Sequence, residues 1–98
     1  MLFRSTHSIY HNGYSRDDIH AEFLYGTPDG ARVQVQRSKH QATIVVTFQA
    51  REEDEAVRVV DRIKREATMR WSADHLGLSV KARNGWEDVD LTDTLRDW

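Results

Sequence analysis

The spacing of hydrophobic residues changes at Arg51, and this change most constrains the fold of the chain. After Arg51, apolar residues recur every three or four positions as far as Trp71, which places them along one stripe of a helix. Acidic residues crowd the start of this segment and basic residues lie toward its end, as the helix dipole favours. We therefore predict a long amphipathic helix over residues 51–71. Its apolar stripe consists of Ala56, Val60, Ile63, Ala67 and Trp71.

A turn signal at residues 27–30 (TPDG) predicts a β-hairpin before the helix. Proline, aspartate and glycine stand where a type I turn followed by a left-handed glycine requires them. With Pro-Asp-Gly as the loop, Tyr25 pairs with Val33 and Phe23 pairs with Val35, so apolar side chains share one face. This register predicts a strand on each side of the turn.

A second loop at residues 38–41 (SKHQ) extends the same sheet by another hairpin. An earlier strand near residues 2–10 joins through the turn-rich segment that follows it, which completes a four-stranded antiparallel meander. The pairs predicted across the second loop are Val35 with Ile44, Val33 with Val46, Gln34 with Val45 and Arg32 with Thr47.

The long helix is predicted to cover one face of this meander and to leave the other face uncovered. Polar residues dominate the uncovered face, which is typical of a solvated antiparallel sheet, and a protein-binding surface is the alternative interpretation. The registers assign to it Arg32, Gln34, Gln36, Thr43, Val45, Thr47, Glu22 and Leu24.

The dipeptide Asn84-Gly85 predicts another hairpin near the end of the chain, because type I′ turns favour this pair. With the dipeptide as the loop, Trp86 lies on the sheet face that the long helix does not cover. The predicted pairs are Arg83 with Trp86, Lys81 with Asp88, Val80 with Val89 and Leu78 with Leu91.

These elements predict a single α+β domain over residues 1–98, since a chain of this length fits one core. Its architecture is an antiparallel four-stranded meander, one long helix packed on one face, then a C-terminal β-hairpin and a short terminal helix. The terminal helix covers residues 91–98 (LTDTLRDW), with Thr92 as its N-cap.

Composition and motifs exclude several classes of function. The chain has no cysteine, so disulfides, thiol nucleophiles and cysteine zinc sites are absent. It contains no glycine-rich phosphate loop, no GxSxG elbow and no HExxH pair among its five histidines. We therefore expect no enzyme activity, no metal and no cofactor. No apolar run approaches membrane-spanning length, so we expect a cytoplasmic protein without membrane contact.

A protein partner is the leading functional hypothesis. Residues 72–98 carry six acidic and three basic groups, and tryptophan and arginine are frequent interface hot spots. We expect a non-catalytic inhibitor or adaptor; one version is a viral or mobile-element antagonist whose carboxylates replace phosphates on a host nucleic-acid enzyme. Self-association stays open, through pairing of sheet edges or through the uncovered face. The predicted contact residues are Lys81, Arg83, Trp86, Glu87, Asp88 and Asp90.

Single-stranded nucleic acid is the alternative partner. Basic residues of the second hairpin and tyrosines near the first strand are suited to follow a phosphate backbone and to stack bases. Glu22 and the acidic end of the chain weigh against this alternative, so nucleic acid is less expected than protein. The residues assigned to it are Arg32, Arg37, Lys39, His40, Tyr10 and Tyr14.

Overall fold

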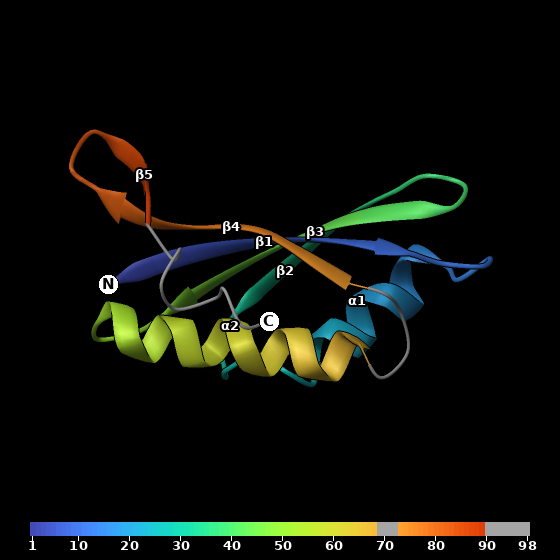
Figure 1. The fold of residues 1–98 in the computed structure, drawn as a ribbon, viewed down its shortest axis with the longest axis horizontal. Helices are drawn as coiled ribbons and strands as arrows, with labels where there is room; N and C mark the ends of the chain where they lie inside the picture. Colours follow the sequence, from blue (N-terminus) through green and yellow to red (C-terminus); the bar gives the residue numbers. More distant parts are fainter. Residues whose placement is uncertain (69–72, 90–98) are drawn as a thin grey trace.

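A five-stranded antiparallel sheet with two helices on one of its faces makes up the computed structural model, which describes residues 1–68 and 73–89 (Figure 1). The predicted α+β class is therefore confirmed. The elements are β1 (Leu2–Tyr10), α1 (Arg16–Leu24), β2 (Arg32–Arg37), β3 (Gln41–Gln49), α2 (Glu53–Thr68), β4 (Ala73–Ala82) and β5 (Gly85–Asp88).

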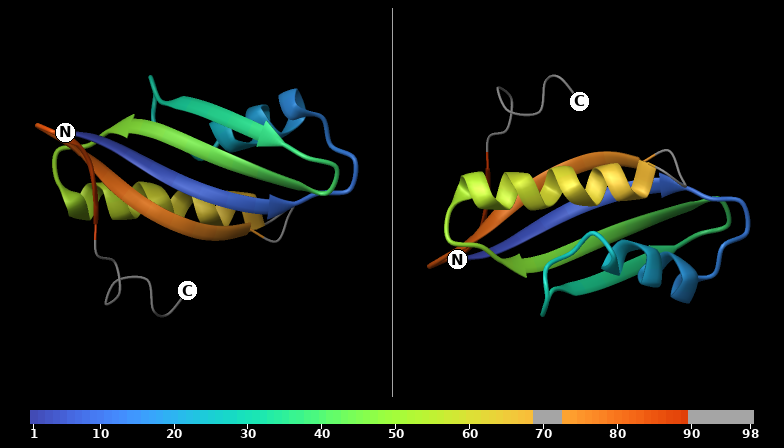
Figure 2. Two further views of the ribbon diagram at one scale, coloured as in Figure 1. Left: turned by 90° about the horizontal axis from the view of Figure 1, so that it is seen from above. Right: turned by 90° about the horizontal axis from the view of Figure 1, so that it is seen from below.

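The strands lie in the order β2-β3-β1-β4-β5. The succession of β1 to β4 with their two helices is the β-α-β-β-α-β arrangement of ferredoxin-like folds, to which β5 adds a fifth strand. The predicted four-stranded meander is wrong, because β1 lies between β3 and β4 instead of next to β2 (Figure 2). Chain order was a poor guide here, since helix crossovers separate strands that follow each other in sequence.

The strand predicted before the TPDG turn is instead the end of helix α1. Ser15 caps this helix, because its Oγ accepts a hydrogen bond from the Asp18 backbone N–H at 3.1 Å. Ile19 and Phe23 stand four residues apart and both point into the core, which is helical spacing. The predicted pairs of Tyr25 and Phe23 with β2 are therefore wrong, although the turn itself forms with Gly30 at a φ of 83°.

The hairpin between β2 and β3 has the predicted register. Val35 pairs with Ile44 and Val33 pairs with Val46. The predicted long helix is confirmed as α2, whose Ala56, Val60 and Ile63 pack in the core beneath the sheet. Trp71 lies outside the described residues. The core between sheet and helices also contains Phe3, Ile9, Ile44, Val46, Phe48 and Leu78.

The β4–β5 hairpin forms, but with a register shifted by two residues. Lys81 pairs with Trp86 and Ala82 pairs with Gly85, so the loop is Arg83-Asn84. A type I′ turn needs positive φ at both loop residues, and among the described residues only glycines have positive φ, with Gly85 at 131°. The predicted pairing of Arg83 with Trp86 is therefore wrong.

Two further predictions on the end of the chain fall outside the described residues. They are the terminal helix over residues 91–98, with its N-cap Thr92, and the pairing of Leu78 with Leu91. Among the helices of the described part of the chain, none has the length and apolar character needed to cross a membrane.

Candidate functional site: the open face of the sheet

Both helices lie on the same side of the sheet, so its other side, here called the open face, is bare of helix (Figures 1 and 2). Side chains of β1 and β3 alternate between a buried set and a partly exposed set, and the partly exposed set forms this face. The prediction for the open face holds for β2 and β3 but fails for Glu22 and Leu24, which belong to α1. The face includes Arg4, Thr6, Ser8, Arg32, Gln34, Gln36, Thr43, Val45 and Thr47.

The middle of the open face consists of small or uncharged side chains. Thr6 of β1 pairs with Val45 of β3, which pairs in turn with Gln34 of β2. The neighbouring row places Thr47 between Arg4 and Arg32. Because adjacent strands lie about 4.8 Å apart, these two arginines start from backbone positions roughly 10 Å apart on one face.

Trp86 lies at one end of the open face, beside two cations. The guanidinium carbon of Arg4 is 4.4 Å from the centre of the indole ring, and Lys81 Nζ is 5.7 Å from it. Both distances suit cation–π contacts. Trp86 was predicted on the face that the long helix does not cover, and this is confirmed. The indole is partly exposed there.

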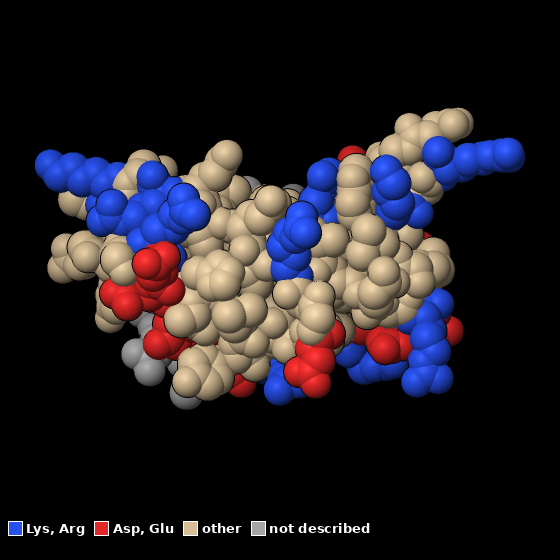
Figure 3. Space-filling view, turned by 180° about the vertical axis from the view of Figure 1, so that it is seen from behind, with Lys and Arg blue, Asp and Glu red and all other residues tan. Residues whose placement is uncertain are grey.

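Carboxylates lie mainly on the helix side of the molecule, whereas cations lie on both sides and supply most of the charge of the open face. Lys and Arg line the upper edge of Figure 3, where the open face lies, while Asp and Glu lie mainly in its lower half. Among the described residues, the strands contribute Arg4, Arg32 and Lys81 to this face, and the two hairpin loops that border it contribute Lys39 and Arg83. Arg37 ends β2 and pairs with the buried Ala42, so it points to the helix side. Asp88 lies on the same face, and its Oδ1 accepts a hydrogen bond from Ser79 Oγ at 3.2 Å.

The predicted partner-binding residues divide between the two faces of the hairpin. Lys81, Trp86 and Asp88 belong to the open face, and Arg83 is in the turn. Glu87 pairs with Val80 and therefore points to the helix side. Asp90 lies outside the described residues.

Most of the predicted nucleic-acid residues belong to the β2–β3 hairpin end and the end of β1, opposite the β4–β5 hairpin (Figure 1), whereas Arg32 lies in the same row as Arg4. Arg37 Nε donates a hydrogen bond to the Tyr14 carbonyl at 2.5 Å, which ties the β2–β3 hairpin to the loop before α1. Tyr10 ends β1 and is 55% exposed. Arg32 lies on the open face, while Lys39 and His40 are exposed in the hairpin loop. The structure therefore brings together Arg32, Lys81 and Trp86 on the open face and leaves Glu87 and Arg37 on the helix side.

Arg4 is the residue of this face that sequence reasoning missed. The alternation of β1 carries the signal, but Ser5 and His7 occupy positions on its buried side and weaken the apolar pattern. Arg4 would have been found by extending the alternation from Phe3 and Ile9, both fully buried, to the residues between them.

The buried histidines have packing roles. His7 Nε2 lies 3.0 Å from Ser5 Oγ, and the His7 ring contacts Phe23 with ring centres 5.9 Å apart. A serine beside a histidine can act as a nucleophile, but both residues here are 0% exposed and no substrate can reach them. His11 Nε2 donates to the Ser38 carbonyl at 3.0 Å and fastens the end of β1 to the hairpin loop.

Within residues 1–68 and 73–89, no group of three or more histidine or carboxylate side chains is placed to hold a metal ion.

Comparison with known proteins gives no family for the chain. No protein-family model matches the sequence, and no curated protein matches it. The chemistry of the open face is therefore the basis for a function.

Proposed function

We propose that the protein is a non-catalytic binding protein that holds single-stranded nucleic acid on its open sheet face. The observation that carries the proposal is the convergence of cations from distant parts of the sequence on this face. Arg4, Arg32 and Lys81 come from three different strands, and two basic turns border the same surface. Such a surface is suited to follow a phosphate backbone.

Aromatic groups at two ends of the face support the same ligand. Trp86 lies partly exposed beside Arg4 and Lys81, and Tyr10 is exposed at the far end of β1. Unpaired bases stack on aromatic rings of open antiparallel sheets, whereas duplex bases are not available for stacking. The small side chains between the two rings leave room for the backbone. The ligand that best fits these features is single-stranded.

The formal net charge of −2 does not conflict with this proposal. Carboxylates of the described residues lie chiefly on the helix side, away from the open face (Figure 3). Long-range repulsion is screened over about 10 Å at 0.1 M salt, whereas contacts on the face are direct. We therefore expect binding that is modest in affinity and strongly dependent on salt.

Fluorescence anisotropy with a labelled twelve-nucleotide oligothymidine tests the proposal at low and moderate salt. Arg32→Glu is expected to weaken binding about tenfold, because it replaces a cation of the open face with a negative charge. Arg58→Glu, an exposed change on α2, is the matched control and should leave affinity unchanged. Absence of binding by the unaltered protein at low salt would refute the function.

A protein partner remains the second candidate, in the form of an inhibitor or adaptor. It is favoured by the β4–β5 hairpin, which extends from the body and presents Trp86 with Lys81 and Arg83 (Figure 1). Indole and guanidinium groups are frequent interface anchors. A Trp86→Ala variant that retains its thermal stability and its oligonucleotide affinity, but loses a captured protein, would favour this candidate over nucleic acid.

A further inference from the structure

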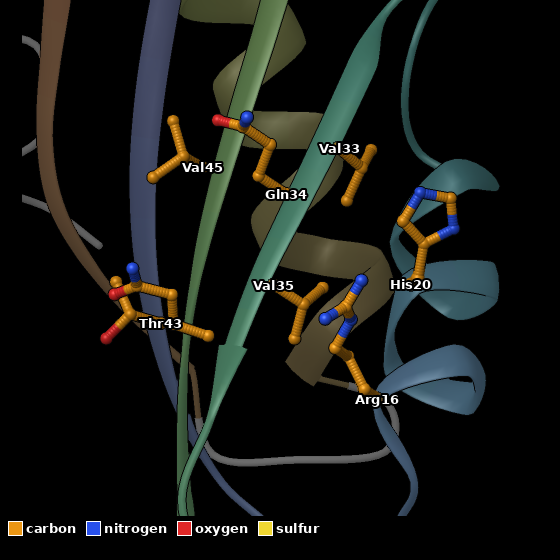
Figure 4. Close-up of a pocket in the computed structure, with 8 residues that line it drawn as sticks. Arg16, His20, Val33, Gln34, Val35, Thr43 and Val45 are labelled. Atoms are coloured by element: carbon orange, nitrogen blue, oxygen red, sulfur yellow. The ribbon is translucent and has the colours of Figure 1, made fainter.

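A groove runs between the edge strand β2 and helix α1, apart from the cations and aromatics of the open face. Its volume is about 470 Å³. In Figure 4, Arg16 and His20 extend from α1 toward Val35 and Val33 of β2. From the open face it is lined by Gln34 and Gln36 of β2 and by Thr43 and Val45 of β3. The groove therefore follows the edge of the sheet along the middle of β2.

The outer edge of β2 has no strand beside it in the described part of the chain. The strand order places β2 at the end of the sheet, where it pairs with β3 alone. An edge strand presents backbone N–H and C=O groups that can pair with another extended segment. Helix α1 flanks this edge, so the space holds a single extended segment more readily than the edge of a whole sheet (Figure 4).

Side chains around the groove specify the charge of an occupant. Arg16 and His20 are four residues apart, so they lie on the same face of α1. The lining residues include no carboxylate. Val33 and Val35 supply apolar contact for alternate side chains of an added strand. An extended peptide with an acidic side chain next to a β-branched one matches this lining.

We propose that the groove binds an extended acidic peptide segment of another protein, which adds to β2 as a further strand. Its carboxylate pairs with the Arg16 guanidinium, and its backbone pairs with the free edge of β2. A second copy of β2 does not match, because its sequence RVQVQR holds two arginines and no acid. A second copy of β5 is acidic but supplies only four residues, already paired in a hairpin.

Labelled, capped nine-residue peptides of alternating valine and threonine provide the probe. One carries a central glutamate, a second a central lysine, and a third carries the glutamate with N-methyl groups on alternate amides. Anisotropy should show binding of the first, roughly fivefold weaker binding of the second, and none of the third. In NMR spectra, the first should shift amide signals of residues 16–20 and 33–36.

Arg16→Glu supplies the decisive variant, since Arg16 is exposed at the start of α1 and its replacement leaves the core intact. It should reverse the preference, so that the lysine peptide binds better than the glutamate peptide. Arg58→Glu on α2 should keep the original preference. Thermal melting checks that each variant folds.

Three results would overturn the inference. The first is equal binding of the glutamate and lysine peptides by the unaltered protein. The second is a dimer in sedimentation experiments that Arg16→Glu dissolves, which would make a second copy the occupant. The third is displacement of the peptide by the oligothymidine, which would join the groove to the open face. The first two outcomes leave the nucleic-acid function untouched.

Discussion

At the scale of single residues, His7 shows how a polar side chain can serve as core material. Its ring is 0% exposed and packs between Ser5 and Phe23. Surface histidines are the usual expectation, and sequence alone placed His7 in a weak strand. The β1 alternation includes it on the buried side because its neighbours Phe3 and Ile9 fix the strand register.

We expect His7→Ala to lower the free energy of unfolding by about 2–3 kcal/mol. The change removes a ring from a closed core and leaves a cavity beside Phe23. His40→Ala is the control, because His40 is exposed in the β2–β3 loop, and it should change stability by less than about 0.5 kcal/mol. Urea denaturation followed by tryptophan fluorescence measures both. Equal stabilities of the two variants would contradict the packing role.

At the scale of elements, α1 is the helix that the sequence conceals. Its nine residues bury only Ile19 and Phe23, so the apolar period is too short to compete with a plausible hairpin pattern. The cap Ser15 and the acidic residues after it were the available signal for a helix start. By contrast, α2 spans Glu53–Thr68, and its apolar stripe repeats often enough to predict a helix. The β2–β3 register was predictable because a short loop joins the two strands.

The contact of the segment after α1 with α2 gives a test at this scale. A Cβ added to Gly26 would lie 3.1 Å from the Cα of Ile63, a backbone atom that cannot turn aside. Gly26→Ala should therefore cost about 1–3 kcal/mol of stability by overpacking. Gly77→Ala is the matched control, because no atom lies within 4 Å of its added Cβ.

Differential scanning fluorimetry distinguishes the two glycine variants. The melting temperature should fall for the Gly26 variant and hold or rise for the Gly77 variant, since alanine suits a strand better than glycine. If both variants melt like the unaltered protein, the close contact of Gly26 with α2 is wrong.

At the scale of the whole molecule, the sheet gathers charges that the sequence disperses. Sequence reasoning placed Trp86 on the correct face in spite of a wrong hairpin register, because a shift of two residues preserves side-chain alternation. Strand order was beyond its reach, since the neighbours of β1 are set by contacts across most of the chain. The candidate site therefore depends on the position of β1 between β3 and β4, which brings Arg4 onto the same face as Arg32 and Lys81.

The arrangement predicts which cations respond to salt. For single-stranded nucleic acid, the slope of log affinity against log salt changes by about 0.7 for each phosphate contact removed. Arg4→Gln and Arg32→Gln should each reduce the slope by about that amount, and the double variant by the sum. Arg58→Gln, on the helix side, should not alter it. Titrations of the oligothymidine from 20 to about 200 mM salt provide the measurement; identical slopes would contradict contact at the open face.

The position of β1 in the middle of the sheet bears on how the protein acquires its fold. Phe3 pairs with Phe48 on one side and with Val80 on the other. In a nascent chain that lacks β4, the side of β1 that pairs with β4 is unpaired. Its backbone N–H and C=O groups are then free to pair with another chain. The pairing of β1 with β4 joins residues from opposite parts of the sequence, and long-range pairing of this kind slows folding.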